Sequence, residues 1–113
     1  MGLFDKLKGA VENLAQEIEV ATAMDLRELA DVMKETKLLD PKMMAYKPVF
    51  KDKCEKLEDD EIEEFYKEIK KAGSFFKTHP GKEVVEEVLV ERRMYVRNDD
   101  GTITKNTAYK WFR

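Results

Sequence analysis

Residue types that build chemical sites are scarce in this chain, which has one cysteine, one serine and one histidine among 113 residues. A lone cysteine, Cys54, forms no intrachain disulfide and offers no metal cluster, which is typical of a reducing compartment. Nucleophilic catalysis needs a nucleophile beside a base, but Ser74 and His79 stand in a predicted loop without an oxyanion-hole motif. We therefore expect a buried, structural Cys54, a solvent-exposed His79, and no enzymatic activity, cofactor or metal site.

Long apolar runs are also missing. No run approaches the roughly 20 residues that a membrane-spanning helix needs. A secretory signal would have an uninterrupted apolar core, and Asp5, Lys6 and Lys8 interrupt the N-terminal segment. We therefore expect a cytoplasmic protein.

Charge is abundant and unevenly distributed. Charged residues make up 40% of the chain, hydrophobic residues 42%, and the net charge is −3. Residues 92–113 contain six basic and two acidic residues, so this segment carries +4 and residues 1–91 carry −7. Such asymmetry indicates either two faces with different partners or a basic tail that docks on its own acidic body. The length suits a single domain over residues 1–113, with a helical body to about residue 91 and a basic, aromatic hairpin and tail beyond it.

Helical periodicity covers most of the first sixty residues. The first helix is predicted from about residue 3 to residue 20, followed by a break. Thr22, with Asp25 three residues later, has the pattern of a capping box that opens a second helix ending near Lys37. Beyond a short turn, Pro48 is expected to restart the pattern and open a third helix.

Later segments give clearer boundaries. The acidic run Glu58–Glu61 is predicted to start a fourth helix, because carboxylates suit the positive end of the helix dipole, and Gly73 is predicted to end it. Residues 84–90 fit a fifth helix or a strand, since their valines favour either. Residues 94–97 and 102–105 read as a β-hairpin with Gly101 in its turn. The expected fold is mainly α, a compact bundle of four to five short helices with a C-terminal β-hairpin (α or α+β).

An apolar stripe begins almost at the first residue. Phe4, Leu7, Val11, Leu14 and Ile18 follow one another at steps of three and four residues, which places them along one side of a helix. Such a stripe needs a cover. The pattern leaves three alternatives open: the core of the same chain, a second copy of the chain or another partner, or a membrane surface.

The opening Met-Gly-Leu-Phe-Asp-Lys-Leu-Lys resembles the start of phage shock protein A relatives. This resemblance implies an amphipathic helix that settles on membranes through Leu3 and the five stripe residues, with Lys6 and Lys8 beside them. Three glutamates, Glu12, Glu17 and Glu19, make the rest of the helix acidic, which opposes binding to anionic lipids.

Binding to a protein partner is the function that these features favour, as expected of an adaptor, regulator or inhibitor. Two surfaces are candidates. One is acidic and comprises Glu58, Asp59, Asp60 and Glu61. The other is aromatic and basic, of residue types enriched at binding hot spots, and comprises Tyr95, Arg97, Tyr109 and Trp111.

Nucleic-acid binding is the alternative. A helix followed by a hairpin resembles, in outline, the recognition helix and wing of winged-helix proteins. Its phosphate contacts would come from Arg92, Arg93, Arg97, Lys105 and Lys110. Four glutamates on the same helix oppose this alternative, because they would face the phosphate backbone: Glu83, Glu86, Glu87 and Glu91.

Overall fold

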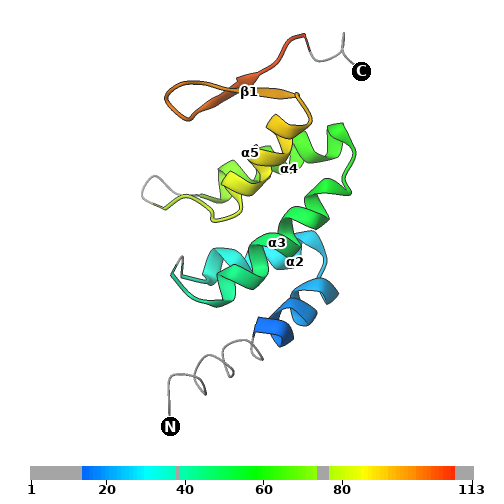
Figure 1. Ribbon diagram of the computed structural model, residues 1–113, viewed down its shortest axis with the longest axis vertical. Helices are drawn as coiled ribbons and strands as arrows, with labels where there is room; N and C mark the ends of the chain where they lie inside the picture. The colour runs from blue at the N-terminus through cyan, green and yellow to red at the C-terminus, as the bar shows by residue number, and fades with distance from the viewer. Residues whose placement is uncertain (1–13, 38, 74–76, 109–113) are drawn as a thin grey trace. The chain divides into compact units, whose positions relative to one another are not determined.

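The computed structural model describes residues 14–37, 39–73 and 77–108 (Figure 1). Within these ranges the chain forms five helical segments followed by a two-strand antiparallel hairpin, which confirms the predicted mainly α fold. The chain folds as two compact units, residues 1–53 and 54–113.

The N-terminal unit contains helical residues 14–23, helix α2 (Leu26–Glu35) and most of helix α3 (Lys42–Glu55). Helix α2 is amphipathic and buries Leu29, Ala30 and Met33, which are spaced for one helix face. Other buried apolar side chains of this unit are Ala21, Met43, Ala45, Tyr46 and Phe50. Their apolar surface forms the core of the unit.

The start of α2 differs from the prediction. The capping residue is Asp25, whose carboxylate accepts the backbone N–H of Glu28 at 2.8 Å. Thr22 was expected in this role, but it lies inside the preceding helix and donates its hydroxyl to the carbonyl of Ile18 at 2.7 Å. Inside a helix, a threonine hydroxyl can donate a hydrogen bond to the carbonyl four residues earlier. A carboxylate such as that of Asp25 is favoured at the helix N-terminus, because this end of the helix dipole is positive. The helix therefore continues past the predicted break.

Helix α3 also differs from the prediction, because Pro48 lies inside it and does not restart it. A proline in a helix interior lacks the N–H for the carbonyl four residues back and costs about 3 kcal/mol. The helix is buried on both sides of this position, through Ala45 and Tyr46 before it and Phe50 after it. Burial of these side chains offsets the missing hydrogen bond.

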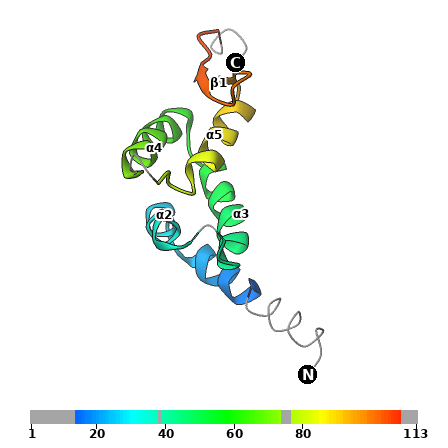
Figure 2. The ribbon, with the colours of Figure 1, turned by 90° about the vertical axis from the view of Figure 1, so that its left-hand side faces the viewer.

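The C-terminal unit contains helices α4 (Asp59–Ala72) and α5 (Lys82–Glu91) and strands β1 (Tyr95–Arg97) and β2 (Ile103–Lys105). Helices α4 and α5 lie side by side in both views (Figures 1 and 2). Residues 84–90, for which helix and strand were both open, belong to α5. Val84, Val85, Val88 and Leu89 are all buried, as the i, i+3, i+4 spacing of a helix face requires.

The predicted β-hairpin is confirmed by strands β1 and β2. Tyr95 is paired with Lys105 and Arg97 with Ile103 in an antiparallel register. The turn is closed by the N–H of Gly101, which donates to the carbonyl of Asn98 at 3.0 Å. Gly101 has a φ of 88°, a left-handed conformation that glycine adopts without steric cost.

Candidate functional site

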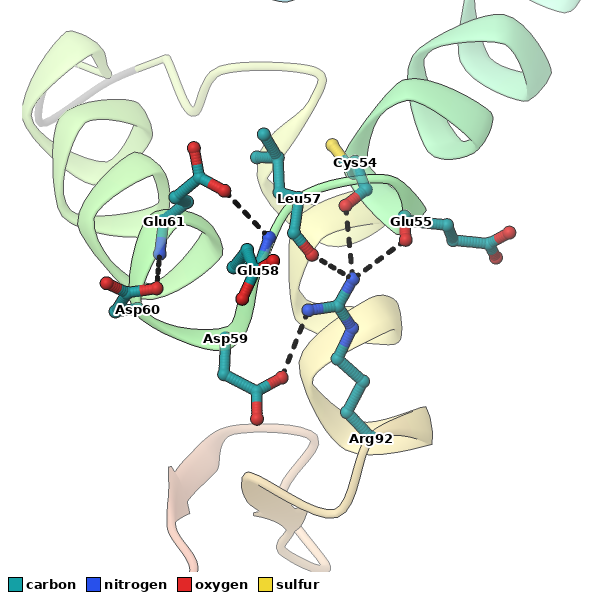
Figure 3. A network of polar contacts seen from close by, with 8 residues as sticks. All are labelled: Cys54, Glu55, Leu57, Glu58, Asp59, Asp60, Glu61 and Arg92. Carbon is teal, nitrogen blue, oxygen red and sulfur yellow. Dashed lines mark hydrogen bonds and ion pairs between the residues drawn. The ribbon is translucent and has the colours of Figure 1, made fainter.

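The side chain of Arg92 holds a polar cluster in the C-terminal unit (Figure 3). Its Nη1 donates to Asp59 Oδ1 at 3.2 Å. Its Nη2 faces three backbone carbonyls, those of Cys54 at 3.4 Å, Glu55 at 2.9 Å and Leu57 at 2.7 Å. One guanidinium therefore binds the end of α3, the connection after it and the start of α4.

Helix geometry explains this arrangement. The last carbonyls of an α-helix have no partner within the helix and carry partial negative charge, which favours a cation. Arg92 caps the C-terminus of α5, and its N–H donates to the carbonyl of Val88. From there its side chain reaches the end of α3, and it is only 21% exposed. Arg92, which was predicted to contact phosphate, therefore uses its guanidinium in contacts within the chain.

The acidic run at the start of α4 has a local structural role. The carboxylate of Glu61 accepts the backbone N–H of Glu58 at 3.0 Å, and that of Asp60 accepts the N–H of Glu61 at 3.0 Å. These contacts satisfy donors that a helix N-terminus leaves unpaired. Glu58, Asp60 and Glu61 remain exposed to solvent, whereas Asp59 is half-buried beside Arg92.

The hairpin is tied to the same helix. Glu63 of α4 accepts the hydroxyl of Tyr95 at 3.4 Å and pairs with Lys105 Nζ at 3.0 Å. The rings of Tyr95 and Tyr66 meet edge to face, with centroids 5.8 Å apart. Burial, with the nearby Glu63 carboxylate, raises the pKa of Tyr95. Arg92 on Asp59 and Lys105 on Glu63 are thus two basic residues of the C-terminal segment that dock on acidic residues of α4, as one of the two alternatives for the charge asymmetry expects.

We name the resulting surface the α4–hairpin surface. It combines residues from both sets that the sequence predicted as separate binding surfaces. Glu63, Tyr95 and Lys105 are in contact with one another, and we include in the surface their neighbours along the chain, Asp59 and Asp60 in α4 and Arg97 in β1. Arg97 lies on the same side of the hairpin as Tyr95, because alternate residues of a strand share a face. Its guanidinium is exposed and donates to the carbonyl of Gly101 at 2.9 Å.

A buried carboxylate near this surface was not foreseen. Glu86 of α5 is 9% exposed and accepts the hydroxyl of Tyr66 at 2.7 Å. Lys82 Nζ lies 3.8 Å from the same carboxylate. Burial and the neighbouring Glu86 raise the pKa of Tyr66. The sequence prediction treated Glu86 as a surface charge, since the pairing depends on a contact 20 residues away along the chain.

Two of the residues considered for catalysis, Cys54 and His79, are buried in the fold. Cys54 is buried as expected, and burial raises the pKa of its thiol to about 12. His79 was expected to contact solvent, which is wrong: it is 4% exposed, and its Nδ1 accepts the N–H of Gly81 at 2.9 Å. The histidine lies at the start of α5, where helix N–H groups need acceptors. Ser74 lies outside the described residues.

Several other predicted site residues also lie outside the described part of the chain. They are Leu3, Phe4, Leu7, Val11, Tyr109, Lys110 and Trp111. Of the remaining stripe residues, Leu14 is half-buried and Ile18 is 45% exposed. Arg93, a predicted phosphate contact, is exposed and has a φ of 64°.

The N-terminal unit contains an open groove of about 740 Å³. Its walls come from α2, the following loop and the first turns of α3. Its lining residues are Asp31, Val32, Glu35, Thr36, Lys37, Asp40, Lys42 and Tyr46. Among the described residues, no three His, Cys, Asp or Glu side chains converge as metal ligands do.

Comparison with known proteins adds no assignment: the chain matches no family model, no curated protein and no solved structure. None of the helices within the described residues has both the length and the apolar character needed to cross a bilayer.

Proposed function

We propose that this chain is a small macromolecule-binding protein, an adaptor, regulator or inhibitor, that recognises a protein partner through the α4–hairpin surface. The observation that carries the proposal is the contact of Glu63 with Tyr95 and Lys105. This contact joins α4, the helix that begins with the acidic run, to the basic, aromatic hairpin, although Glu63 and Tyr95 are 32 residues apart along the chain.

The composition of this surface supports recognition of a protein. Tyrosine and arginine provide much of the binding energy at protein interfaces, and Tyr95 is held in place by its ring contact with Tyr66. Exposed Asp60 and Arg97 present charges of opposite sign. A partner with the complementary arrangement of charges would be preferred over other proteins. It would also bind in one orientation, because the reverse orientation would bring like charges together.

The same contacts weigh against the nucleic-acid alternative. Phosphate binding needs cationic groups that are available to the backbone. Arg92 is engaged with Asp59 and three carbonyls, and Lys105 is paired with Glu63. Among the described residues of this segment, these contacts leave two exposed arginines, Arg93 and Arg97, for phosphate binding. Two such residues, next to an acidic helix start, form a poor electrostatic footprint for DNA or RNA.

The roles of Cys54 and His79 support a function without covalent chemistry. The thiol is buried and has a raised pKa, so little reactive thiolate is present at neutral pH. The Nδ1 of His79 serves as a hydrogen-bond acceptor for the backbone. Both side chains are buried and stabilise the fold, so neither is presented to a substrate at the surface.

Affinity capture from the native extract tests the proposal. Tagged wild-type protein should retain a specific partner, and the charge reversal Arg97→Glu should release it. Lys71→Glu is the matched control, because it reverses an exposed lysine at the other end of α4; it should retain the partner. Equal retention by wild type and Arg97→Glu would contradict the proposal. So would retention of the protein on a DNA or RNA column at low salt that Arg93→Ala weakens.

A further inference from the structure

Arg93 occupies a position at the end of α5 where helices usually have glycine. Its N–H donates to the carbonyl of Val90 at 3.0 Å, and the N–H of Met94 donates to the carbonyl of Leu89 at 3.0 Å. These two hydrogen bonds form a Schellman motif, which requires a left-handed residue at the position of Arg93. Arg93 accordingly has a φ of 64°, and among the described residues no other residue besides glycine has a positive φ. In this conformation the Cβ atom of an L-residue is crowded by the following carbonyl oxygen, which is unfavourable.

The surrounding contacts fix the backbone of this turn. Leu89 and Met94 are both buried, as is usual for the apolar pair of a Schellman motif. From the far end of the hairpin, Asn106 donates its side-chain amide to the carbonyl of Arg93 at 2.8 Å and its backbone N–H to the carbonyl of Met94 at 2.9 Å. A strained residue persists where the surrounding structure determines the backbone in this way.

The side chain of Arg93 does not explain why arginine stands in the turn. It is exposed, and its guanidinium has no hydrogen-bond or ion-pair partner among the described residues. Glycine would adopt the same backbone conformation without steric cost. Within the chain, arginine at this position therefore lowers stability and contributes no compensating contact.

We propose that Arg93 presents its guanidinium to an acidic segment of the protein partner and is a second anchor beside Arg97. This inference rests on the proposed function. Residues that depart from local structural preference concentrate at functional sites. A guanidinium binds a carboxylate through two parallel hydrogen bonds, and a fixed backbone reduces the entropy lost on binding.

The positions of the two arginines indicate the form of the acidic segment. Arg93 precedes β1, and Arg97 is its last residue. Four steps of an extended chain, at about 3.3 Å each, place their Cα atoms at most about 13 Å apart. An extended partner segment with two carboxylates within about four residues of each other can therefore reach both arginines.

Urea unfolding of Arg93→Gly and Arg93→Ala tests the strain. Glycine relieves the crowding at Cβ, but it is also more flexible in the unfolded chain, so Arg93→Gly should raise the folding equilibrium constant roughly two- to fivefold. Alanine keeps the Cβ atom, so Arg93→Ala should unfold at the same urea concentration as the wild type. An Arg93→Gly variant no more stable than Arg93→Ala would overturn the inference.

Affinity capture of the partner tests the anchor. Arg93→Gly and Arg93→Ala should both retain several-fold less partner than the wild type, although only Arg93→Gly is more stable. Arg93→Lys keeps the charge without the paired hydrogen bonds and should retain an intermediate amount. Lys71→Ala is the matched control, because it removes an exposed cation at the other end of α4, and it should retain the partner fully. Poly-L-glutamate should release more partner than sodium chloride of the same ionic strength, since it competes for the arginines.

The two proposals fail in different ways. Release of the partner by Arg97→Glu, with full retention by both Arg93→Gly and Arg93→Ala, would overturn this inference and leave the proposed function standing. Retention of the partner by Arg97→Glu, or a wild type that captures no specific partner, would overturn the proposed function and this inference with it. Salt-sensitive retention of the wild type on an RNA column, weakened by Arg93→Ala, would assign Arg93 to phosphate binding and overturn both.

Discussion

Arg92 Nη1 and Asp59 Oδ1 lie 3.2 Å apart and join the end of α5 to the start of α4 across 33 residues of sequence. The pair is part of a larger contact, because Nη2 of the same guanidinium also binds backbone carbonyls at the end of α3. A hydrogen bond to a carbonyl depends on the position of the donor as well as on its charge. The cluster therefore requires arginine at this position.

Replacement of Arg92 should destabilise the chain far more than replacement of its ionic partner. We expect Arg92→Ala to lower the free energy of unfolding by about 1–3 kcal/mol, because it removes the guanidinium that donates to the partly buried Leu57 carbonyl and to the Glu55 carbonyl. Asp59→Asn should cost about 0–1 kcal/mol, as is usual for a solvent-accessible ion pair. Urea unfolding measures both, with Arg93→Ala as the exposed neighbouring control. Equal losses for Arg92→Ala and Asp59→Asn would show that the ion pair alone matters.

Pro48 should be a site of easy stabilisation. Alanine at this position restores an N–H within α3 and removes the ring, so Pro48→Ala should raise the free energy of unfolding by about 1–3 kcal/mol. Thermal and urea unfolding, followed by circular dichroism at a helical wavelength, measure the change. A variant less stable than the wild type would mean that the proline is required by the packing of α3.

Alkaline pH should weaken the fold through Tyr46. Burial and the hydrogen bond to Glu17 raise the pKa of this phenol from 10.0 to about 12. Between these values the unfolded chain ionises Tyr46 and the folded chain does not, so the free energy of unfolding falls as pH rises through this window. Below pH 10.0 the contribution is constant.

The comparison of Tyr46→Phe with the wild type measures this contribution. Urea unfolding at successive pH values should give a shallower alkaline loss for the variant. Some loss should remain, because the pKa of Cys54 is also raised to about 12. Identical slopes for the two proteins would contradict the assignment.

His79 should be required as an acceptor at the start of α5. Its Nδ1 accepts the N–H of Gly81, and its carbonyl accepts the N–H of Lys82 at 3.1 Å. His79→Leu keeps an apolar body but removes the side-chain acceptor, which should cost about 1–3 kcal/mol. His79→Asn should be the more stable of the two, because an asparagine side chain can accept the same N–H two residues on. The reverse order in urea unfolding would assign the role of His79 to packing alone.

Local patterns were sufficient to predict the order of helices and the hairpin. The apolar spacing of residues 84–89, the acidic start at Glu58–Glu61 and the glycine turn at Gly101 each act within a few residues. Pro48 was misread because its local preference against helix is outweighed by burial of Tyr46 and Phe50, which periodicity around a proline does not reveal.

The candidate site was predicted only in part. The sequence indicated which residues could form a binding surface, but it did not predict which of them are in contact. Arg92 with Asp59 and Lys105 with Glu63 are contacts between segments more than 30 residues apart. The sequence carried one signal of them, the opposite net charges of the two segments. The burial of His79 and Glu86 had no such signal, because each depends on a neighbour that only the folded chain supplies.

If the start of α4 and the hairpin act as one binding surface, charge reversal in either part should release the same partner. Quantitative capture of that partner by Arg97→Glu and by Asp60→Lys, each compared with the wild type and with Lys71→Glu, measures this. We expect both surface variants to lose the same protein and Lys71→Glu to keep it. Loss of different proteins by the two variants, or of none by either, would contradict it.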